Sequence, residues 1–357
     1  MPIDDFLNYQ LPDDRIAQHP AGSSGERSSS QLLYARRTPQ GLSIEDGQFF
    51  RLPSLLRKGD LLVLNDSRVV PCRFFVRHGT SEIEILLLER RDTKAGGAEV
   101  WEALARPMRK LRSGDEIKLS ERISAAVVGR NESGDRIILE LSLRGGAVSL
   151  GEAIEYDGSM PIPGYIRNGR AESFDRDLYQ TVFARSAGSV AAPTAGLHFT
   201  PRLLEELKAG GIDSCTLTLH VGPASFQPVR DRDNHPMPYE RFTVPNETAQ
   251  RIERARSAGG RVVGVGTTTT RCLESVAHNA FEQDGERTKT KLFIKPGFQF
   301  RAIDLLITNF HQPQTSHLLL VAAFIGEKET AAIYEHALRG SYRFLSYGDA
   351  MLLENDI

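Results

Sequence analysis

Side chains able to carry protons stand at several points where a strand is predicted to end. They are His198 in GSVAAPTAGLHFT (188–200), His220 in TLHVG, His311 in TNFH (308–311) and Asp349 in YRFLSYGDAML (342–352). Imidazole titrates near pH 6.5 and can serve as acid or base near neutrality, while a carboxylate can fix its tautomer. A lone histidine is more often structural, so that alternative stays open for each. Together they predict general acid–base chemistry, with the base unassigned among the four.

Four successive threonines follow the apolar run of RVVGVGTTTTRCLES (261–275). This order predicts a strand, a hydroxyl-rich turn and a helix. Only two glycines of the dinucleotide fingerprint are matched, because Thr269 takes the place of the third, so no pyrophosphate site is predicted. Hydroxyls at a helix N-terminus can instead hold a polar or anionic group, such as a carboxylate, against the helix dipole. Helix capping alone is the alternative, although it needs only one of the four.

The segment 188–200 is dense in small residues. Such residues let a backbone approach a ligand closely and leave N–H groups to bind it, whereas a tightly packed loop is the structural alternative. Open α/β sheets bind ligands at the carboxyl ends of strands, which adds Asn309 to the candidates. The predicted substrate-binding residues are Ala192, Pro193, Thr194, Gly196, Gly266, Thr267, Thr268, Thr269, Arg271, Asn309 and Tyr347.

Four cations are concentrated in the segment ARPMRKLRSGD, at Arg106, Arg109, Lys110 and Arg112. A solvated surface is the common role of such a cluster. In a protein that must hold a nucleic-acid backbone, the same side chains would grip phosphates. The sequence has no GxSxG or HExxH motif, so a serine hydrolase or zinc enzyme is not favoured.

The elements that position these residues fall into two groups. Between residues 59 and 150, short apolar runs are separated by turn residues, at 61–65, 73–77, 83–89, 100–105, 116–120, 125–129 and 136–143. Their length and their Val, Ile and Phe content predict strands joined by tight turns. About seven strands without a helix predict a small β-barrel.

Helical and strand-like segments alternate from residue 175 onward. Helices are predicted at 201–210, at 246–260, from Arg271, and near 315–325 and 328–339, and strands at 213–222, 261–266, 291–295 and 304–310. This alternation predicts an α/β fold with a largely parallel sheet covered by helices on both faces. The segment 30–59 is too short to fold alone and is expected to pack on this sheet. The predicted domains are therefore an α/β domain of residues 1–65 plus 156–357 and an inserted β-barrel of residues 66–155.

The composition is that of a globular protein. The 357 residues carry 44 Lys+Arg against 46 Asp+Glu, a net charge of −2, and 40% are hydrophobic. A dedicated non-specific nucleic-acid binder carries a basic excess, so any nucleic-acid contact must be local. The longest apolar run, 318–326, is shorter than the roughly 20 residues of a membrane span, and the acidic N-terminal segment differs from a secretion signal, so we expect a cytoplasmic protein. Cys72, Cys215 and Cys272 lack metal-ligand spacing and are predicted to be buried.

The order and wording of these motifs resemble one family, the S-adenosylmethionine:tRNA ribosyltransferase-isomerases of the queuosine pathway. The resembling blocks are LLVLNDSRVVP (61–71), LYQTVFA (178–184), GSVAAPTAGLHFT (188–200), TLHVGPASFQPV (218–229), VGTTTTRCLES (265–275), FIKPGFQF (293–300), TNFHQP (308–313) and YRFLSYGDAML (342–352). The opening DFLNYQLPDDRIAQHP (5–20) fits as well. The resemblance thus covers almost the whole chain.

The resemblance implies an α/β domain interrupted by a β-barrel, and it implies a reaction. The ribosyl part of S-adenosylmethionine is transferred and isomerised onto 7-aminomethyl-7-deazaguanine at the wobble position of tRNA. Epoxyqueuosine in tRNA, adenine and methionine are the products. The resemblance further implies S-adenosylmethionine as co-substrate, no metal, a tRNA with a GUN anticodon as partner, and a monomer.

This reaction requires both an acid and a base. The sulfonium acidifies the neighbouring ribose C5′ hydrogens, so a positioned base can start the sequence, and protonation of the purine assists the loss of adenine. The acceptor amine must lose a proton before it attacks the ribose. No covalent enzyme intermediate is required, so the reaction needs no nucleophilic serine or cysteine.

The sequence departs from the family pattern at several positions. Pro238 replaces the second histidine of HxMHxE, Ala224 lies in HVGPASF where relatives have HVGxGTF, and Gln31 replaces an arginine. These changes keep open the alternative of a paralogue that uses S-adenosylmethionine to modify a small molecule. A non-catalytic tRNA-binding module is a third alternative, which the retained TNFH and YGD motifs disfavour.

Overall fold

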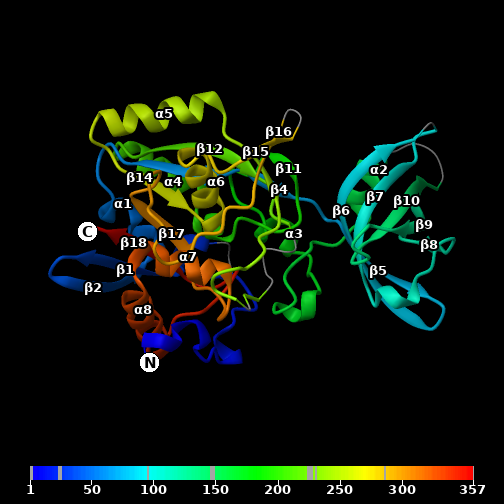
Figure 1. Ribbon diagram of the computed structural model, residues 1–357, viewed down its shortest axis with the longest axis horizontal. Helices are drawn as coiled ribbons and strands as arrows, with labels where there is room; N and C mark the ends of the chain where they lie inside the picture. Colours follow the sequence, from blue (N-terminus) through cyan, green and yellow to red (C-terminus); the bar gives the residue numbers. More distant parts are fainter. Residues whose placement is uncertain are drawn as a thin grey trace. The chain divides into compact units, whose positions relative to one another are not determined.

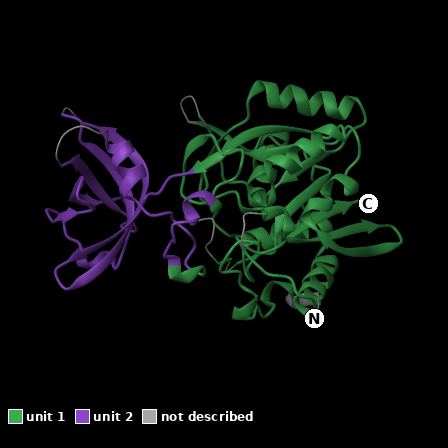
Figure 2. Cartoon of the chain, turned by 180° about the vertical axis from the view of Figure 1, so that it is seen from behind, with its two compact units in different colours: residues 1–68, 165–168, 178–357 green, residues 69–164, 169–177 purple. Residues whose placement is uncertain are grey.

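A computed structural model of the chain describes residues 3–22, 26–94, 96–144, 149–222, 228–229, 231–284 and 287–356. The chain divides into two compact units, which are coloured separately in Figure 2. The first unit comprises residues 1–68, 165–168 and 178–357, and the second comprises residues 69–164 and 169–177. Most of the second unit is thus one continuous stretch of sequence between two parts of the first.

A sheet of ten strands, within the described residues, forms the centre of the first unit (Figure 1). Its order is β15 (Glu282–Asp284), β16 (Arg287–Thr290), β13 (Glu240–Thr243), β12 (Asp213–Leu219), β3 (Leu61–Asn65), β14 (Val262–Val265), β17 (Leu305–Asn309), β18 (Ala350–Asn355), β1 (Gln31–Thr38) and β2 (Gly41–Gln48). The four central strands β12, β3, β14 and β17 run parallel to one another. β3, β14 and β17 are buried along their whole length, which is typical of parallel strands covered on both faces.

The sheet as a whole is mixed, so the prediction of a largely parallel sheet is not confirmed. β18 runs antiparallel to β17 and parallel to β1, and β1 pairs with β2 in a hairpin. At the other edge, β12, β13, β16 and β15 pair in antiparallel fashion. A two-residue connection such as the one between β1 and β2 permits only an antiparallel pair, because parallel strands need a long crossover. The α/β class itself is confirmed.

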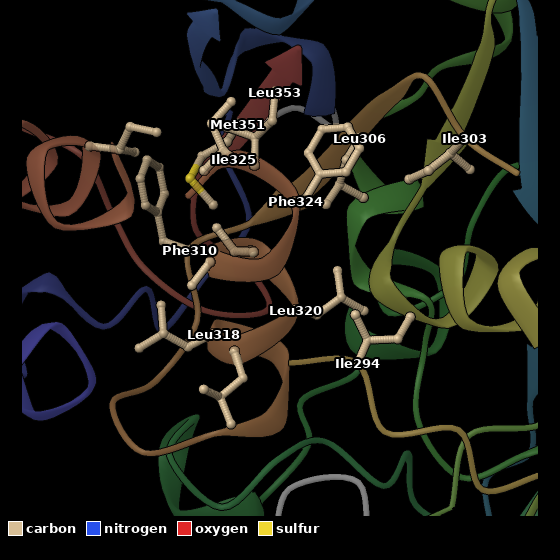
Figure 3. Close-up of a cluster of buried hydrophobic side chains, with 14 of the residues drawn as sticks. Ile294, Ile303, Leu306, Phe310, Leu318, Leu320, Phe324, Ile325, Met351 and Leu353 are labelled. Atoms are coloured by element: carbon tan, nitrogen blue, oxygen red, sulfur yellow. The ribbon is translucent and has the colours of Figure 1, made fainter. Parts of the chain in front are cut away.

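Helices cover both faces of the sheet. Successive residues of β17 point to opposite faces, so Leu306 lies in one apolar cluster and Leu305 in the other. The cluster around Leu306 includes side chains of α6 (Thr267–Ala277), α7 (Ser316–Ile325) and α8 (Glu327–Arg339), and the other includes side chains of α4 (Pro201–Ala209). Figure 3 shows Phe324 of α7 next to Leu306, with Leu320 and Leu318 further along the same helix. α7 is apolar on nearly all sides and is almost fully buried, as such a helix must be.

Helix punctuation in the sequence locates α4 and α5 (Asn246–Ser257) closely. The Thr200 hydroxyl accepts a hydrogen bond from the Leu203 N–H at 3.1 Å and so caps α4, and Pro201 opens this helix, in agreement with the helix predicted at 201–210. α6 begins at Thr267, four residues before the predicted start at Arg271.

The predicted strand at 291–295 is wrong, since the structure has no strand there. Its backbone bonds to side chains rather than to a neighbouring strand. The Leu292 N–H donates to the Thr290 hydroxyl at 3.0 Å, and the Leu292 carbonyl accepts from Arg271 Nε at 3.1 Å. A β-ladder therefore cannot use these groups.

Six antiparallel strands, counted over the described residues, form the sheet of the second unit. Its order is β5 (Arg73–His78), β6 (Ser81–Thr93), β7 (Glu99–Arg106), β10 (Ile137–Leu143), β9 (Ile123–Arg130) and β8 (Glu116–Lys118). The edge strands β5 and β8 approach each other, although no ladder joins them in the described part, so the sheet is a nearly closed barrel. The predicted β-barrel is thus confirmed as a nearly closed, barrel-like sheet. The strand predicted at 61–65 does not belong to it, because this segment is β3 of the large sheet. α2 (Leu150–Asp157) begins with a capping box between Ser149 and Glu152.

The remaining elements are short. They are β4 (Ser67–Val69), β11 (Ser186–Ser189), α1 (Leu52–Leu55), α3 (Asp175–Leu178) and the 3-10 helices η1 (Ile3–Asn8), η2 (Asp13–Arg15), η3 (Arg27–Ser29), η4 (Phe49–Arg51), η5 (Met108–Lys110), η6 (Arg167–Gly169) and η7 (Thr194–His198). Across the described ranges, no helix has the length and apolar character needed to cross a membrane.

Candidate functional site

A pocket lined by both polar and apolar residues lies in the first unit at the carboxyl ends of parallel strands β14 and β17. Eight of the predicted site residues line it: Ala192, Pro193, Thr194, Gly266, Thr267, Thr268, Asn309 and His311. They come from η7 and the residues before it, from the turn between β14 and α6, and from the end of β17. The carboxyl ends of parallel strands are the usual ligand site of an open α/β sheet. The structure therefore brings three separate sequence motifs to one place.

The turn from β14 into α6 depends on Gly266. Its φ of 91° lies in the region that favours glycine, and its N–H donates to the Ile307 carbonyl at 2.8 Å. In the described residues no side chain caps the start of α6, so helix capping does not account for the threonines. Thr267 and Thr268 line the pocket, whereas Thr269 is fully buried away from it.

The sequence resemblance implies S-adenosylmethionine as co-substrate. If this pocket binds it, we expect the double variant Thr267→Val and Thr268→Val to bind it more weakly, because the variant keeps the side-chain shape and loses both hydroxyls from the pocket wall. Each lost polar contact should cost about 1 kcal/mol of binding free energy. Thr269→Val is the matched control, since the Thr269 hydroxyl does not line the pocket. Calorimetry should give weaker binding for the double variant and wild-type affinity for the control. Equal affinities in all three proteins would remove the threonine turn from the site.

His198 lies behind the pocket rather than in its wall. Its Nδ1 is 2.7 Å from the Ser30 hydroxyl, its Nε2 is 3.1 Å from Asn309 Nδ2, and its ring stacks on Phe49 with 5.0 Å between centroids. Burial, and then the nearby charges of Arg343 and Arg27, lower the pKa of His198 to about 3. The imidazole is therefore neutral near pH 7.

His311 and His317 form a stacked pair in the pocket wall. Their ring centroids are 5.2 Å apart with 24° between the planes. His311 Nε2 is 2.8 Å from the Thr308 hydroxyl, and two buried tyrosines hold the His311 peptide: Tyr9 donates to its carbonyl, and its N–H donates to the Tyr334 hydroxyl at 2.9 Å. Burial, and then the neighbouring His317, hold the pKa of His311 well below its usual value. Both rings are thus available as neutral proton acceptors.

The pKa of His317 is lowered to about 4, chiefly by burial and then by the positive charge of Arg271, while Glu240 acts in the opposite direction. His317 is in the first turn of α7, where the positive end of the helix dipole also disfavours an imidazolium. A second proton on the stacked pair would place two cations side by side. The pair therefore has room for one proton at most near neutral pH.

Asp349 is buried, and its carboxylate accepts hydrogen bonds from backbone N–H groups. Its carboxylate accepts from the Gln31 N–H at 2.9 Å and the Arg343 N–H at 2.7 Å, and it is 3.6 Å from the Arg343 guanidinium. Burial raises the pKa of Asp349 above its usual value. None of these contacts is with a histidine, so the structure does not bring Asp349 to the imidazoles as an orienting group.

Four other predicted residues also lie outside the pocket wall. His220 packs against Gly188, where an added Cβ would lie 3.2 Å from the ring. Gly196 leaves no room for a side chain, because a Cβ would lie 2.8 Å from Phe183. Tyr347 packs edge-on against Tyr179 and, with His198, lines a separate small hollow. Arg271 is buried in an ion pair with Glu240.

The basic cluster lies at the end of β7 and in and after η5 of the second unit. Arg106, Arg109, Lys110 and Arg112 are all exposed. Over the described residues, no acidic side chain forms an ion pair with any of the four. Exposed cations without acidic partners are free to meet phosphates.

Several pocket residues were not predicted from the sequence. They are Tyr165, Ala195, Val221, Thr308, Phe310, Gln312, Thr315, His317, Leu345 and Ser346. The signal for Thr315 and His317 was QPQTSHL (312–318), a polar run directly after TNFH. The three cysteines are buried and unpaired, as predicted. Ala224 and the rest of residues 223–227 lie outside the described residues.

In the part of the chain that the structure describes, no group of three or more His, Cys, Asp and Glu side chains is arranged to hold a metal ion. The pocket is lined by hydroxyls, by the carboxamides of Asn309 and Gln312, by two imidazoles and by apolar side chains. Open α/β sheets usually bind their ligands in a pocket at this place, the carboxyl ends of the strands.

Comparison with known proteins places the chain in one family. The model of the family described as queuosine biosynthesis protein matches residues 3–353. The S-adenosylmethionine:tRNA ribosyltransferase-isomerase of Pelobacter propionicus is 44% identical over 351 residues, which are 98% of each chain, and that of Geobacter metallireducens is 42% identical over 99% of this chain and 100% of its own. The crystal structure of the S-adenosylmethionine tRNA ribosyltransferase of Thermotoga maritima matches with 36% identity and a TM-score of 0.54, over 98% of this chain and 100% of its own. The chain belongs to the queuosine biosynthesis protein family.

Proposed function

We propose that this protein transfers and isomerises the ribosyl part of S-adenosylmethionine onto 7-aminomethyl-7-deazaguanine at the wobble position of tRNA, giving epoxyqueuosine-tRNA, adenine and methionine. The observation that carries the proposal is the identity of 42 to 44% with S-adenosylmethionine:tRNA ribosyltransferase-isomerases over nearly the full length of both chains. A small-molecule acceptor is not favoured, because relatives matched over their whole length carry the name of the tRNA enzyme.

In this proposal the pocket of the first unit binds S-adenosylmethionine as co-substrate. Thr267 and Thr268 contact its polar groups, and the small residues from Ala192 to Thr194 let it approach the backbone. The stacked imidazoles of His311 and His317 supply the neutral acceptor that the C5′ proton needs next to a sulfonium. Loss of the C5′ proton leaves a carbanion that the sulfonium stabilises, and the bond from the ribose to adenine breaks as the purine is protonated. The acceptor amine, after losing its proton, forms a bond to a ribosyl carbon. Methionine leaves as a neutral thioether when the bond between C5′ and sulfur breaks.

The second substrate is a tRNA. We propose that its phosphates bind the cationic side chains of Arg106, Arg109, Lys110 and Arg112. We expect Arg109→Ala and Lys110→Ala each to raise the Michaelis constant for tRNA, because each removes an exposed cation. Each should also reduce the slope of log affinity against log salt by about one. Arg202→Ala is the matched control, since Arg202 is an exposed cation of the first unit that pairs with Glu206. If the slope of log tRNA affinity against log salt is unchanged in both loop variants, the loop does not bind phosphates and is only a solvated surface.

Further features of the proposal follow the family. We propose a cytoplasmic monomer that needs no metal, reads tRNA with a GUN anticodon, and uses residues 66–155 as a separate barrel domain inserted into the α/β domain of residues 1–65 and 156–357. The experiment that tests the function is incubation with S-adenosylmethionine and tRNA carrying 7-aminomethyl-7-deazaguanine, followed by nucleoside analysis. Epoxyqueuosine is expected, and its absence beside an active family member would contradict the proposal.

A further inference from the structure

The side chain of Asn309 has a fixed orientation in the pocket wall. Its Nδ2 is 3.2 Å from the Leu345 carbonyl and 3.5 Å from the Asp349 carbonyl. Carbonyl oxygens only accept hydrogen bonds, so the NH2 group must face them. The carboxamide oxygen Oδ1 then faces Thr194, whose hydroxyl donates to it at 2.9 Å.

This orientation also fixes the tautomer of His198. Since Asn309 Nδ2 is a donor, His198 Nε2 must accept from it across 3.1 Å. The ring proton is then on Nδ1, which donates to the Ser30 hydroxyl at 2.7 Å. A charged imidazolium would set one N–H group against another at Asn309. The depth of burial that keeps His198 neutral therefore preserves the arrangement.

The polar protons of Asn309 and Thr194 all have hydrogen-bond partners within the protein. Both protons of Asn309 Nδ2 are used by His198 Nε2 and the backbone carbonyls, and the only proton of the Thr194 hydroxyl is used by Asn309 Oδ1. Thr194 Oγ1 and Asn309 Oδ1 keep unused lone pairs, and both residues line the pocket. Two acceptors with no free donor disfavour a carboxylate and suit an N–H group, above all a charged one.

We propose that Thr194 Oγ1 and Asn309 Oδ1 form an acceptor pair that binds a protonated amine of a substrate, and that His198 is a positioning residue that holds Asn309 together with the Leu345 and Asp349 carbonyls. The inference rests on the proposed function, because both substrates of that reaction carry an amine. One is the α-ammonium of S-adenosylmethionine, and the other is the aminomethyl group of the modified base in tRNA.

The test compares Thr194→Val with its matched control Thr194→Ser, which keeps the hydroxyl. Calorimetry measures the affinity of each for S-adenosylmethionine and for 5′-methylthioadenosine, which lacks the amino-acid part. Loss of a hydrogen bond to a charged group should weaken binding about tenfold or more. If the α-ammonium is bound, Thr194→Val loses affinity for S-adenosylmethionine only. If the base amine is bound, the Michaelis constant of Thr194→Val for tRNA rises instead, and this variant binds S-adenosylmethionine and 5′-methylthioadenosine with wild-type affinity.

His198 is tested by turnover. In His198→Gln the side-chain oxygen can replace Nε2 as the acceptor, so the effect of Thr194 on amine binding should persist and the Michaelis constants should stay within a few-fold of wild type. In His198→Leu this acceptor is lost and only the two backbone carbonyls hold Asn309 Nδ2, so Asn309 is held less firmly and the Michaelis constant for the amine-bearing substrate should rise about tenfold.

The proposal is overturned if folded Thr194→Val matches Thr194→Ser in all affinities and Michaelis constants. It is also overturned if His198→Gln is as impaired as His198→Leu, because the acceptor would then not matter. If the wild-type protein binds S-adenosylmethionine and acts on tRNA but the Thr194 and His198 substitutions change nothing, only the acceptor pair is contradicted. Wild-type protein that binds neither substrate contradicts the proposed function itself.

Discussion

His311→Gln should lower the single-turnover rate of adenine release by about 100-fold, the usual contribution of a positioned acid or base. His311 is the one predicted proton carrier that lines the pocket of the described structure, and its neutral ring faces the space where the co-substrate is proposed to bind. Gln keeps hydrogen-bonding capacity toward Thr308 but cannot accept the proton. His317→Gln should have an effect of similar size if the two stacked rings share that proton.

His336→Gln is the matched control for this prediction, because His336 lies on α8 and pairs with Asp46 away from the pocket. Its rate should equal that of the wild type. A thermal melt on each variant separates lost chemistry from lost folding. Near-wild-type adenine release in folded His311→Gln and His317→Gln would make the stacked pair structural, and Glu240 and His235 would be the next candidates.

Acid should destabilise the first unit before its carboxylates are protonated. The folded-state pKa is about 3 for His198, about 4 for His317 and well below its usual value for His311, against about 6.5 in the unfolded chain. Between pH 4 and 6.5 the unfolded chain binds protons that the folded chain does not. The free energy of unfolding must therefore fall as pH falls through this window, by up to about 1.4 kcal/mol per pH unit for each histidine.

Urea unfolding at several pH values between 7.5 and 5 measures this slope. His198→Gln should reduce the change of the unfolding free energy with pH by the contribution of one histidine, since Gln binds no proton in the folded or the unfolded state. Asp349 acts in the opposite sense, because its raised pKa favours the folded state as it takes up a proton near its usual titration range. Equal slopes for wild type and His198→Gln would show that His198 is charged in the folded protein.

Local signals in the sequence predicted the elements whose structure is decided locally. Turn residues between short apolar runs located the strands of the second unit, and the cap at Thr200 located α4. The edges of the large sheet were harder to predict. β18 pairs with β1 across more than 300 residues, and no local pattern in YGDAMLLEN indicates that partner. Such long-range pairing depends on the packing of the whole sheet.

The candidate site shows the same division. Motif order predicted that Thr194, Thr267 and Asn309 belong together, because strand ends meet at one edge of a sheet. The orientation of His198 could not be predicted, since it depends on Ser30 and Asn309 from distant segments. The polar run QPQTSHL marked the segment of His317, but its stacking on His311 depends on how α7 begins relative to β17 and could not be predicted from the sequence.

The most direct test of the central claim follows the ribose carbons. S-adenosylmethionine labelled with ¹³C in its ribose is incubated with the protein and with tRNA that carries 7-aminomethyl-7-deazaguanine. The tRNA is then digested to nucleosides, and their masses are measured by mass spectrometry. The account predicts epoxyqueuosine that contains all the labelled carbons, with adenine and methionine released in equal amounts. Transfer of a methyl group to the tRNA, or labelled ribose found only on a small molecule, would contradict it.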